Sequence, residues 1–212
     1  VIIATLGEDY HGFEEEWSLP IVLVSPLKDT LHRYVVRSND VAGAQGATSY
    51  LIRLGHSRIG HIGVPTWTLP GRERLEGYRR ALEKAGIAYD PDLVVLGDAH
   101  EEGGYDGIQT LMALPSPPTA LFCFNDLTAV GVLRGARALG LHVPKDLSLI
   151  GFDDIPLACY VAPTLSTMQQ DMYDLGRRAA QMLLDLIAGQ EPEAPLALET
   201  QLVERESSAR YS

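Results

Sequence analysis

Apolar and polar positions follow two different periods along this chain. Seven short, nearly continuous apolar runs have the length of buried β-strands, and longer segments between them place apolar side chains three or four residues apart, as an amphipathic helix does. The strands are expected over residues 1–6, 21–25, 58–63, 93–97, 119–124, 147–152 and 200–205. The helices are expected over residues 41–54, 72–85, 102–114, 126–139 and 171–188.

This alternation predicts an α/β protein with parallel sheets flanked by helices, because parallel neighbouring strands need a crossover connection. Ligands in such folds bind at the carboxyl ends of the strands. The candidates for binding are therefore the polar residues that follow a strand. They are Thr5, Ser25, the loop 65–74, Asp98, Asn125 with Asp126, and Asp153 with Asp154.

Composition narrows the function classes. Of 212 residues, 46% are hydrophobic and 21% are charged, which is ordinary globular usage. The net charge of −11 leaves no broad basic face, so the chain alone is not expected to bind nucleic acid. No apolar run reaches the length of a membrane helix, and we expect a cytoplasmic protein without membrane contact. The start, "VIIATLG", already forms a strand, so we expect that an N-terminal portion is missing.

The adjacent acids Asp153 and Asp154, in "GFDDIP", permit three readings: a metal site, an acid/base pair or a grip on a neutral ligand. A hard cation needs several oxygen ligands, and no further acidic cluster follows another predicted strand except at Asp98. The chain contains no GxSxG, HExxH or P-loop pattern to accompany a catalytic pair. We therefore expect no metal, no cofactor and no catalytic residue.

Three further residues are candidates for ligand contact. Asn125 offers an acceptor and two donors, while its neighbour Asp126 is expected to cap the following helix. Arg74 lies near a predicted helix start, where the helix dipole disfavours a cation. Its side chain either points inward and binds hydroxyls, a carboxylate or a phosphate, or is a solvated surface charge. Trp67, in "GVPTWTLPG", either stacks on a sugar or base or packs against the loop or a partner chain.

Nearly the whole chain resembles the effector-binding core of the LacI/GalR family of bacterial transcriptional regulators. The resemblance rests on "GAQGATSYLIRLGHSRIGHIG", "RERLEGYRRALEKAGI", the closing "LVERESS" and the long segment "PTALFCFNDLTAVGVLRGARALGLHVPKDLSLIGFDDIPLACYVAPTLSTMQQDMYDLGRRAAQMLL". It implies a two-lobed, periplasmic-binding-protein-like fold, a homodimer, and a small effector in the cleft between the lobes. It also implies a helix-turn-helix headpiece for operator DNA, which this sequence lacks together with part of the N-terminal lobe.

The resemblance also assigns roles to residues. Arg74, Asn125 and Asp153 match the family's ligand-contacting positions, and Thr5, Ser25 and Trp67 complete the predicted ligand set. The chain departs from its relatives at Ser25 and Ser38, where acids are common, and at Ala99, where several carry an aromatic ring. Trp67 could supply that ring.

The expected lobes follow from three chain crossings. The partial N-terminal lobe would combine residues 1–38 with 168–195, and the C-terminal lobe residues 39–167 with 196–212. The expected effector is a mono- or oligosaccharide, with a purine or nucleoside as second choice, and it would act by shifting the population of two lobe arrangements. The tail "ESSARYS" has no leucine heptad, so a dimer is expected.

Two alternatives remain at this stage. An exported sugar-binding protein of a transporter would share the fold, and upstream residues with a signal peptide would identify it. A Rossmann-like nucleotide enzyme is disfavoured because no G-x-G-x-x-G follows the first strand.

Overall fold

The computed structural model describes residues 1–4 and 19–211 and divides the chain into two compact units. Unit 1 contains Val1–Asn39 and Asp171–Glu199, and unit 2 contains Asp40–Gln170 and Thr200–Ser212. The chain therefore crosses between the units three times. Each unit has its own sheet and its own core.

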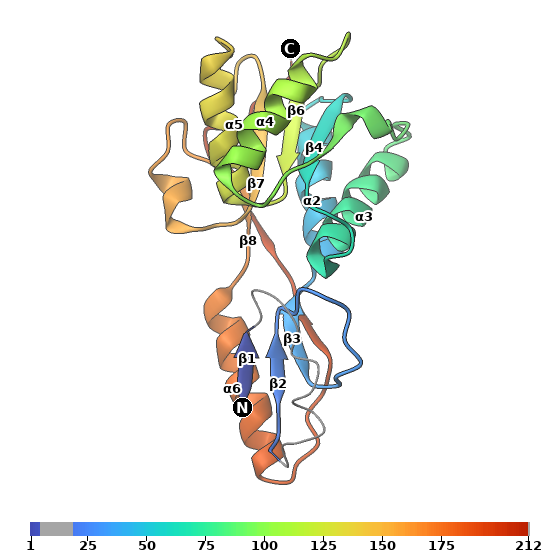
Figure 1. Cartoon of the computed structure of the whole chain (residues 1–212), viewed down its shortest axis with the longest axis vertical. Helices are drawn as coiled ribbons and strands as arrows, with labels where there is room; N and C mark the ends of the chain where they lie inside the picture. Colours follow the sequence, from blue (N-terminus) through green and yellow to red (C-terminus); the bar gives the residue numbers. More distant parts are fainter. Residues whose placement is uncertain (5–18, 212) are drawn as a thin grey trace. The chain divides into compact units, whose positions relative to one another are not determined.

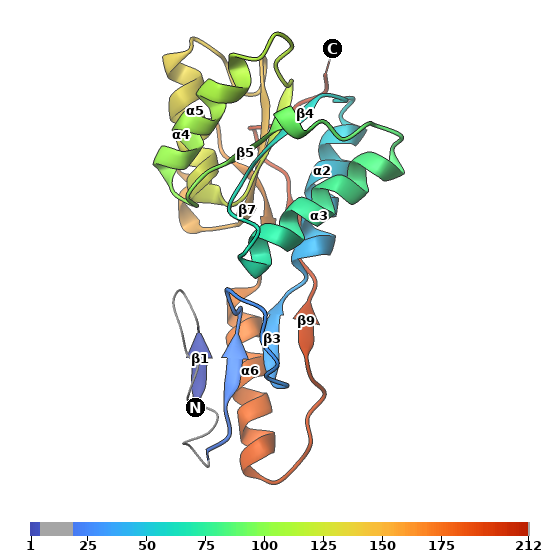
Figure 2. The same cartoon turned by 45° about the vertical axis from the view of Figure 1, so that its right-hand side comes forward.

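Unit 1 is built on a four-stranded parallel sheet in the order β1-β2-β3-β9. Helix α6 (Met172–Ile187) lies along one face of this sheet (Figure 2). Its buried Leu175, Ala179 and Met182 contact valines of β2 and β3. The strands are β1 (Ile2–Ala4), β2 (Val22–Val24), β3 (Val35–Ser38) and β9 (Leu196–Leu198).

Unit 2 is built on a six-stranded sheet in the order β10-β8-β7-β6-β4-β5. All pairs are parallel except β10 with β8. Helices α2 and α3 lie side by side, and so do α4 and α5 (Figures 1 and 2). The elements are α2 (Asp40–Arg53), β4 (Ile59–Gly63), α3 (Leu69–Lys84), η1 (Pro91–Leu93), β5 (Val94–Leu96), α4 (Glu101–Met112), β6 (Ala120–Cys123), α5 (Asp126–Ala138), β7 (Ser148–Asp153), η2 (Pro156–Cys159), β8 (Ser166–Gln169) and β10 (Gln201–Val203).

The central strand β6 explains how one sheet serves two cores. Successive side chains of a strand point to opposite faces. Ala120 and Phe122 belong to the cluster formed with α2 and α3, whereas Leu121 and Cys123 belong to the cluster formed with α4 and α5. A strand buried on both faces must be apolar throughout, which is why "ALFC" has no alternation.

The predicted α/β fold class and its twelve predicted elements are confirmed by the structure. Three further strands, β3, β8 and β9, were not predicted, and α3 begins at Leu69 instead of residue 72. The earlier start has a local cause, because the Thr68 hydroxyl accepts a hydrogen bond from the Gly71 amide and Pro70 occupies the first turn. Among the helices of the described residues, none is long and apolar enough to cross a lipid bilayer.

The capping prediction for α5 was wrong. Asn125, not Asp126, is the N-cap, and its Oδ1 accepts the Thr128 amide at 2.9 Å. Asp126 is fully buried and joins other elements: it accepts the Thr167 hydroxyl of β8 at 2.6 Å and the Ile155 amide at 2.9 Å. Burial raises the pKa of Asp126 to about 7, against the lowering effect of these two hydrogen bonds.

The raised pKa of Asp126 predicts a pH dependence of stability. An unfolded aspartate has a pKa near 3.9, so between about pH 4 and pH 7 the native protein binds more protons at Asp126 than the unfolded chain. The contribution of this bound proton to the free energy of unfolding is fully present below about pH 4 and is lost as the pH rises to about 7. The free energy of unfolding of wild type, minus that of Asp126→Asn, should fall over this range by at most about 1.4 kcal/mol per pH unit. Urea unfolding at stepped pH would measure it, and a difference that rises with pH would contradict the prediction.

A second prediction concerns the contact between α4 and α5. A Cβ on Gly131 would overlap the backbone carbonyl of Glu101, and one on Gly104 would overlap that of Thr128. Gly131→Ala should therefore lower the free energy of unfolding by about 1–3 kcal/mol. Gly176→Ala in α6, where nothing lies within 4 Å, is the control and should be neutral or slightly stabilising. Equal effects in urea unfolding would contradict this account.

Candidate functional site

Three of the predicted ligand residues lie at the carboxyl ends of neighbouring strands in unit 2. Asp153 is the last residue of β7, Asn125 follows β6, and Arg74 of α3 reaches the end of β6 by donating from Nη1 to the Phe124 carbonyl at 2.5 Å. Arg74 Nη2 lies 3.6 Å from Asp153 Oδ1. The folded chain thus brings together residues that are up to 79 positions apart in the sequence.

Arg74 is a buried cation, with 5% of its surface exposed. Its Nε donates to Asp40 Oδ1 at 2.7 Å, which closes a buried ion pair between α3 and the first residue of α2. The guanidinium carbon lies 3.8 Å from the ring centre of Phe152 and 4.5 Å from that of Phe124. Cation–π attraction, the ion pair and the carbonyl together fix the orientation of the guanidinium.

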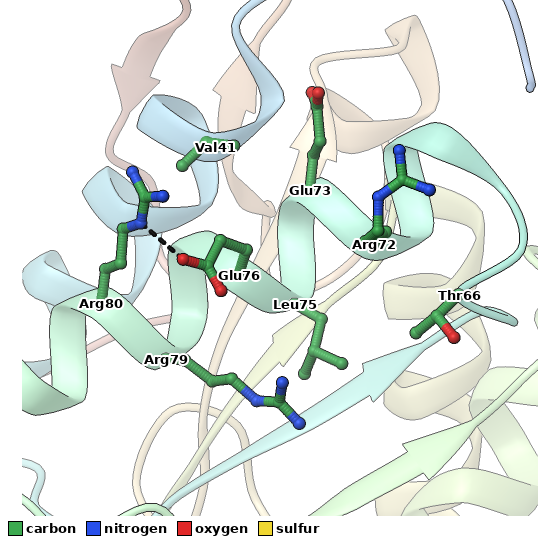
Figure 3. A pocket seen from close by; sticks show the side chains of 8 residues that line it. All are labelled: Val41, Thr66, Arg72, Glu73, Leu75, Glu76, Arg79 and Arg80. Atoms are coloured by element: carbon green, nitrogen blue, oxygen red, sulfur yellow. Dashed lines mark hydrogen bonds and ion pairs between the residues drawn. The ribbon is translucent and has the colours of Figure 1, made fainter. Parts of the chain in front are cut away.

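The reason given from the sequence for an inward Arg74 does not hold. Because α3 begins at Leu69, Arg74 lies in the second turn and not at the unfavourable first turn. Of its neighbours, Arg72 is exposed and Glu73 and Glu76 are partly buried. With Val41, Thr66, Leu75, Arg79 and Arg80 they line a separate surface hollow of about 500 Å³ (Figure 3). In this hollow Arg80 is already paired with Glu76 at 2.7 Å, and the three predicted ligand residues do not line it.

Asp153 is held in a strained backbone conformation, with φ of 115°. Its side chain is 27% exposed, and its Oδ1 accepts the Gln170 amide at 2.5 Å. Burial raises the pKa of Asp153, while Arg74 and Gln170 lower it. Both of these donors approach Oδ1, so Oδ2 is the oxygen without a hydrogen bond among the described residues.

The neighbouring Asp154 makes different contacts. It accepts from Arg205 Nη2 at 2.7 Å and from Gln169 Nε2 at 3.0 Å. These partners tie the turn after β7 to the edge of the sheet. The two adjacent acids therefore have different partners, Asp153 beside Arg74 and Asp154 beside Arg205 and Gln169.

Asn125 is engaged at both ends of its amide. Besides capping α5 with Oδ1, it donates from Nδ2 to the Ala99 carbonyl at 2.9 Å. Contact with a ligand would have to share these bonds, for example through the second hydrogen of Nδ2. Its role as a ligand residue stays a prediction.

The remaining predicted ligand residues lie elsewhere. Trp67 is 62% exposed in the turn before α3. Ser25 belongs to unit 1, where it follows β2 and is exposed with φ of 47°. Thr5 lies outside the described residues. Their contacts with a ligand stay predictions.

The sequence reading missed Asp40, Phe124 and Phe152, which hold Arg74 in place. Phe124 and Phe152 end apolar runs and were assigned to the core. Asp40 precedes a predicted helix and has the appearance of an ordinary acid at a helix start. No local pattern signals a pairing between residues 34 positions apart.

Comparison with known proteins places this chain in a family. Residues 48–208 match the model of a periplasmic binding protein-like domain. The chain is 41% identical over 180 residues to the HTH-type transcriptional repressor CytR of Escherichia coli K12, covering 84% of this chain and 53% of that protein. The chain spans between about half and three fifths of the length of the curated relatives it matches.

Two solved structures share the fold. A LacI-family regulatory protein from Chloroflexus aggregans is 31% identical, with a TM-score of 0.84 over 91% of this chain and 69% of that one. A LacI-family transcriptional regulator from Enterococcus faecium with bound ribose is 29% identical, with a TM-score of 0.81 over 91% of this chain and 72% of that one. The chain therefore belongs to the periplasmic binding protein-like family, among the LacI-family transcriptional regulators.

Proposed function

We propose that this chain is the effector-sensing part of a LacI-type transcriptional regulator, and that its effector is a small uncharged polyol, with a sugar as first choice. The observation that carries the proposal is the buried Arg74 beside the partly exposed Asp153, at the strand ends where α/β proteins bind ligands. A related regulator with ribose bound supports the choice of a sugar.

The chemistry of the two residues suits hydroxyl groups. Asp153 can accept hydroxyl hydrogens through Oδ2, and Arg74 Nη2 can donate to a hydroxyl oxygen on the same side. Neighbouring hydroxyls of a sugar present a donor and an acceptor within a few ångströms. A purine or nucleoside is the second candidate, because its ring nitrogens and ribose hydroxyls also present hydrogen-bond donors and acceptors close to one another.

A binding role is proposed in place of catalysis. The matched relatives are transcriptional repressors. His61 of β4 is sandwiched between Phe122 and Tyr78, and burial lowers its pKa to about 4, so it is a neutral core residue near pH 7. Proton transfer by His61 at neutral pH would require charging an imidazole that the fold keeps out of water.

Regulation would follow from linkage between two binding events. We propose that units 1 and 2 correspond to the two lobes of the family, and that the effector favours one arrangement of the units by its difference in affinity. In the full-length cytoplasmic homodimer, a DNA-binding headpiece would read two operator half-sites whose spacing depends on that arrangement. Effector and operator would then modulate each other's affinity by the same factor.

Isothermal titration calorimetry with ribose, glucose, cellobiose, adenosine and cytidine tests the effector class. Saturable heat with at least one of the sugars is expected. Saturable heat with the nucleosides alone would overturn the sugar assignment. Absence of saturable heat with all five would contradict the proposed effector classes.

The two adjacent acids give a matched pair of variants for this experiment. Asp153→Asn removes the charge that accepts ligand hydroxyls and should weaken binding of the sugar about tenfold or more. Because Asp153 lies 3.6 Å from Arg74 and is 27% exposed, this variant should lower the free energy of unfolding less than Asp154→Asn does. Asp154→Asn breaks the pair with Arg205, whose side chains are only 16% and 11% exposed, and should lower the free energy of unfolding while leaving affinity within about twofold. Equal loss of affinity in both variants would show that the acids act as one unit.

Trp67 provides a separate prediction. If its indole stacks on the sugar, Trp67→Ala should weaken binding by about fivefold to tenfold, and Trp67→Phe should recover part of the loss. The ring is 62% exposed, so the free energy of unfolding should stay within about 0.5 kcal/mol of wild type. Unchanged affinity in Trp67→Ala would remove Trp67 from the site.

A further inference from the structure

Asp40 lies at the point where the chain enters unit 2. It is the first residue of α2 and follows Asn39, the last residue before the crossing. Its side chain is 11% exposed, and its Oδ1 accepts Arg74 Nε at 2.7 Å. The N-terminal end of a helix also stabilises a carboxylate through the helix dipole. Asp40 therefore supplies a buried carboxylate partner that links the start of α2 to Arg74 of α3.

The hydrogen-bonding groups of Arg74 are largely used within the protein. Nε binds Asp40, Nη1 binds the Phe124 carbonyl, and Phe124 and Phe152 lie against the guanidinium. Nη2 lies 3.6 Å from Asp153. Nη2 makes no hydrogen bond among the described residues, and the second carboxylate, that of Asp153, lies beside it.

The charges at this site do not balance. One guanidinium faces two carboxylates, so the group of Arg74, Asp40 and Asp153 carries a net charge of −1 when all three are ionised. A phosphate or carboxylate group on a ligand would meet a cation that is already paired and a second negative charge beside it. In a site shielded from water such repulsion is stronger than it would be in solution.

We propose that Asp40 is a positioning residue that orients and neutralises Arg74, and that the site consequently selects an uncharged effector and rejects anions such as sugar phosphates and nucleotides. The orientation of Arg74 is independent of which effector binds, whereas the selection rests on the proposed function. A hydroxyl can accept from Arg74 Nη2 and donate to Asp153 without adding charge. Without Asp40, the pair of Arg74 and Asp153 would sum to zero and Nε would lose its carboxylate partner, so an anion could take its place.

Nuclear magnetic resonance of the ¹⁵N-labelled 212-residue chain tests the proposal with inorganic phosphate as the probe. The Arg74 Nε–H signal, assigned by its loss in Arg74→Lys, should exchange slowly with water in wild type and should not move with millimolar phosphate. In Asp40→Asn the signal should exchange faster and move saturably, with phosphate binding at least about tenfold tighter than in wild type. A saturable shift in wild type would overturn the proposal without any variant.

Two further variants distinguish the loss of the Asp40 charge from a general disruption of the site. Asp40→Glu keeps the negative charge and should remain insensitive to phosphate; a response equal to that of Asp40→Asn would show that disruption of the site, and not loss of charge, exposes Arg74. Asp154→Asn is the matched control, because Asp154 is paired with Arg205 at the same 2.7 Å and has the same 11% exposure as Asp40. A phosphate response at Arg74 in Asp154→Asn would also overturn the proposal.

The experiment keeps the two proposals distinguishable. The exchange rate and the phosphate response of Arg74 are measured without an effector, so they can fail while sugars still give saturable heat. Conversely, an unchanged Arg74 signal in Asp40→Asn would refute the positioning role and leave the sugar-binding proposal intact.

Discussion

The ordering of this site depends on one constraint: a guanidinium removed from water must find both its counter-charge and its hydrogen bonds inside the protein. Arg74 meets this requirement with partners from three elements, namely the first residue of α2, the end of β6 and the end of β7. A buried charge that loses such a partner destabilises the structure far more than the pair itself stabilises it. The contacts of Arg74 therefore add a polar link between α3, α2 and the strand ends to the apolar packing of these elements.

The same constraint accounts for the residues around the arginine. Phe124 and Phe152 give the cation two aromatic faces, and the chain beyond each ring turns directly into a polar residue, Asn125 or Asp153. Asp153 adopts φ of 115° at this turn, a conformation in which a non-glycine residue is strained. At this turn the carboxylate of Asp153 lies beside Arg74, whereas that of Asp154 is paired with Arg205.

Much of the fold could be predicted because strands buried on both faces, such as β6, are continuous apolar runs. The strands that were not predicted lack that signal. β8 reads "STMQ", yet Ser166 and Thr167 are buried because Ser207 and Asp126 satisfy their polar atoms, and those partners are 41 positions away in the sequence. β9 has three residues, and all of them are partly or fully exposed. The periodicity of apolar positions cannot reveal a strand whose burial depends on distant polar partners, as in β8. It also cannot reveal a strand as short as β9, which has too few residues to show a pattern.

Part of the candidate site could also be named from the sequence. Arg74, Asn125 and Asp153 were candidates because of the predicted strand ends and the family resemblance, and the folded chain brings them together, while their contact with a ligand stays a prediction. The choice between Asn125 and Asp126 as helix cap could not be made, since both residue types cap helices and only the backbone angles decide which one does. Asp40 could not be found from the sequence, although it sets the charge of the site. The residue types alone, Arg, Asn and Asp, sum to a net charge near zero, whereas the folded group includes a second carboxylate and sums to −1 when all its members are ionised. The proposed selection of an uncharged effector therefore depends on a partner of Arg74 that is visible only in the folded chain.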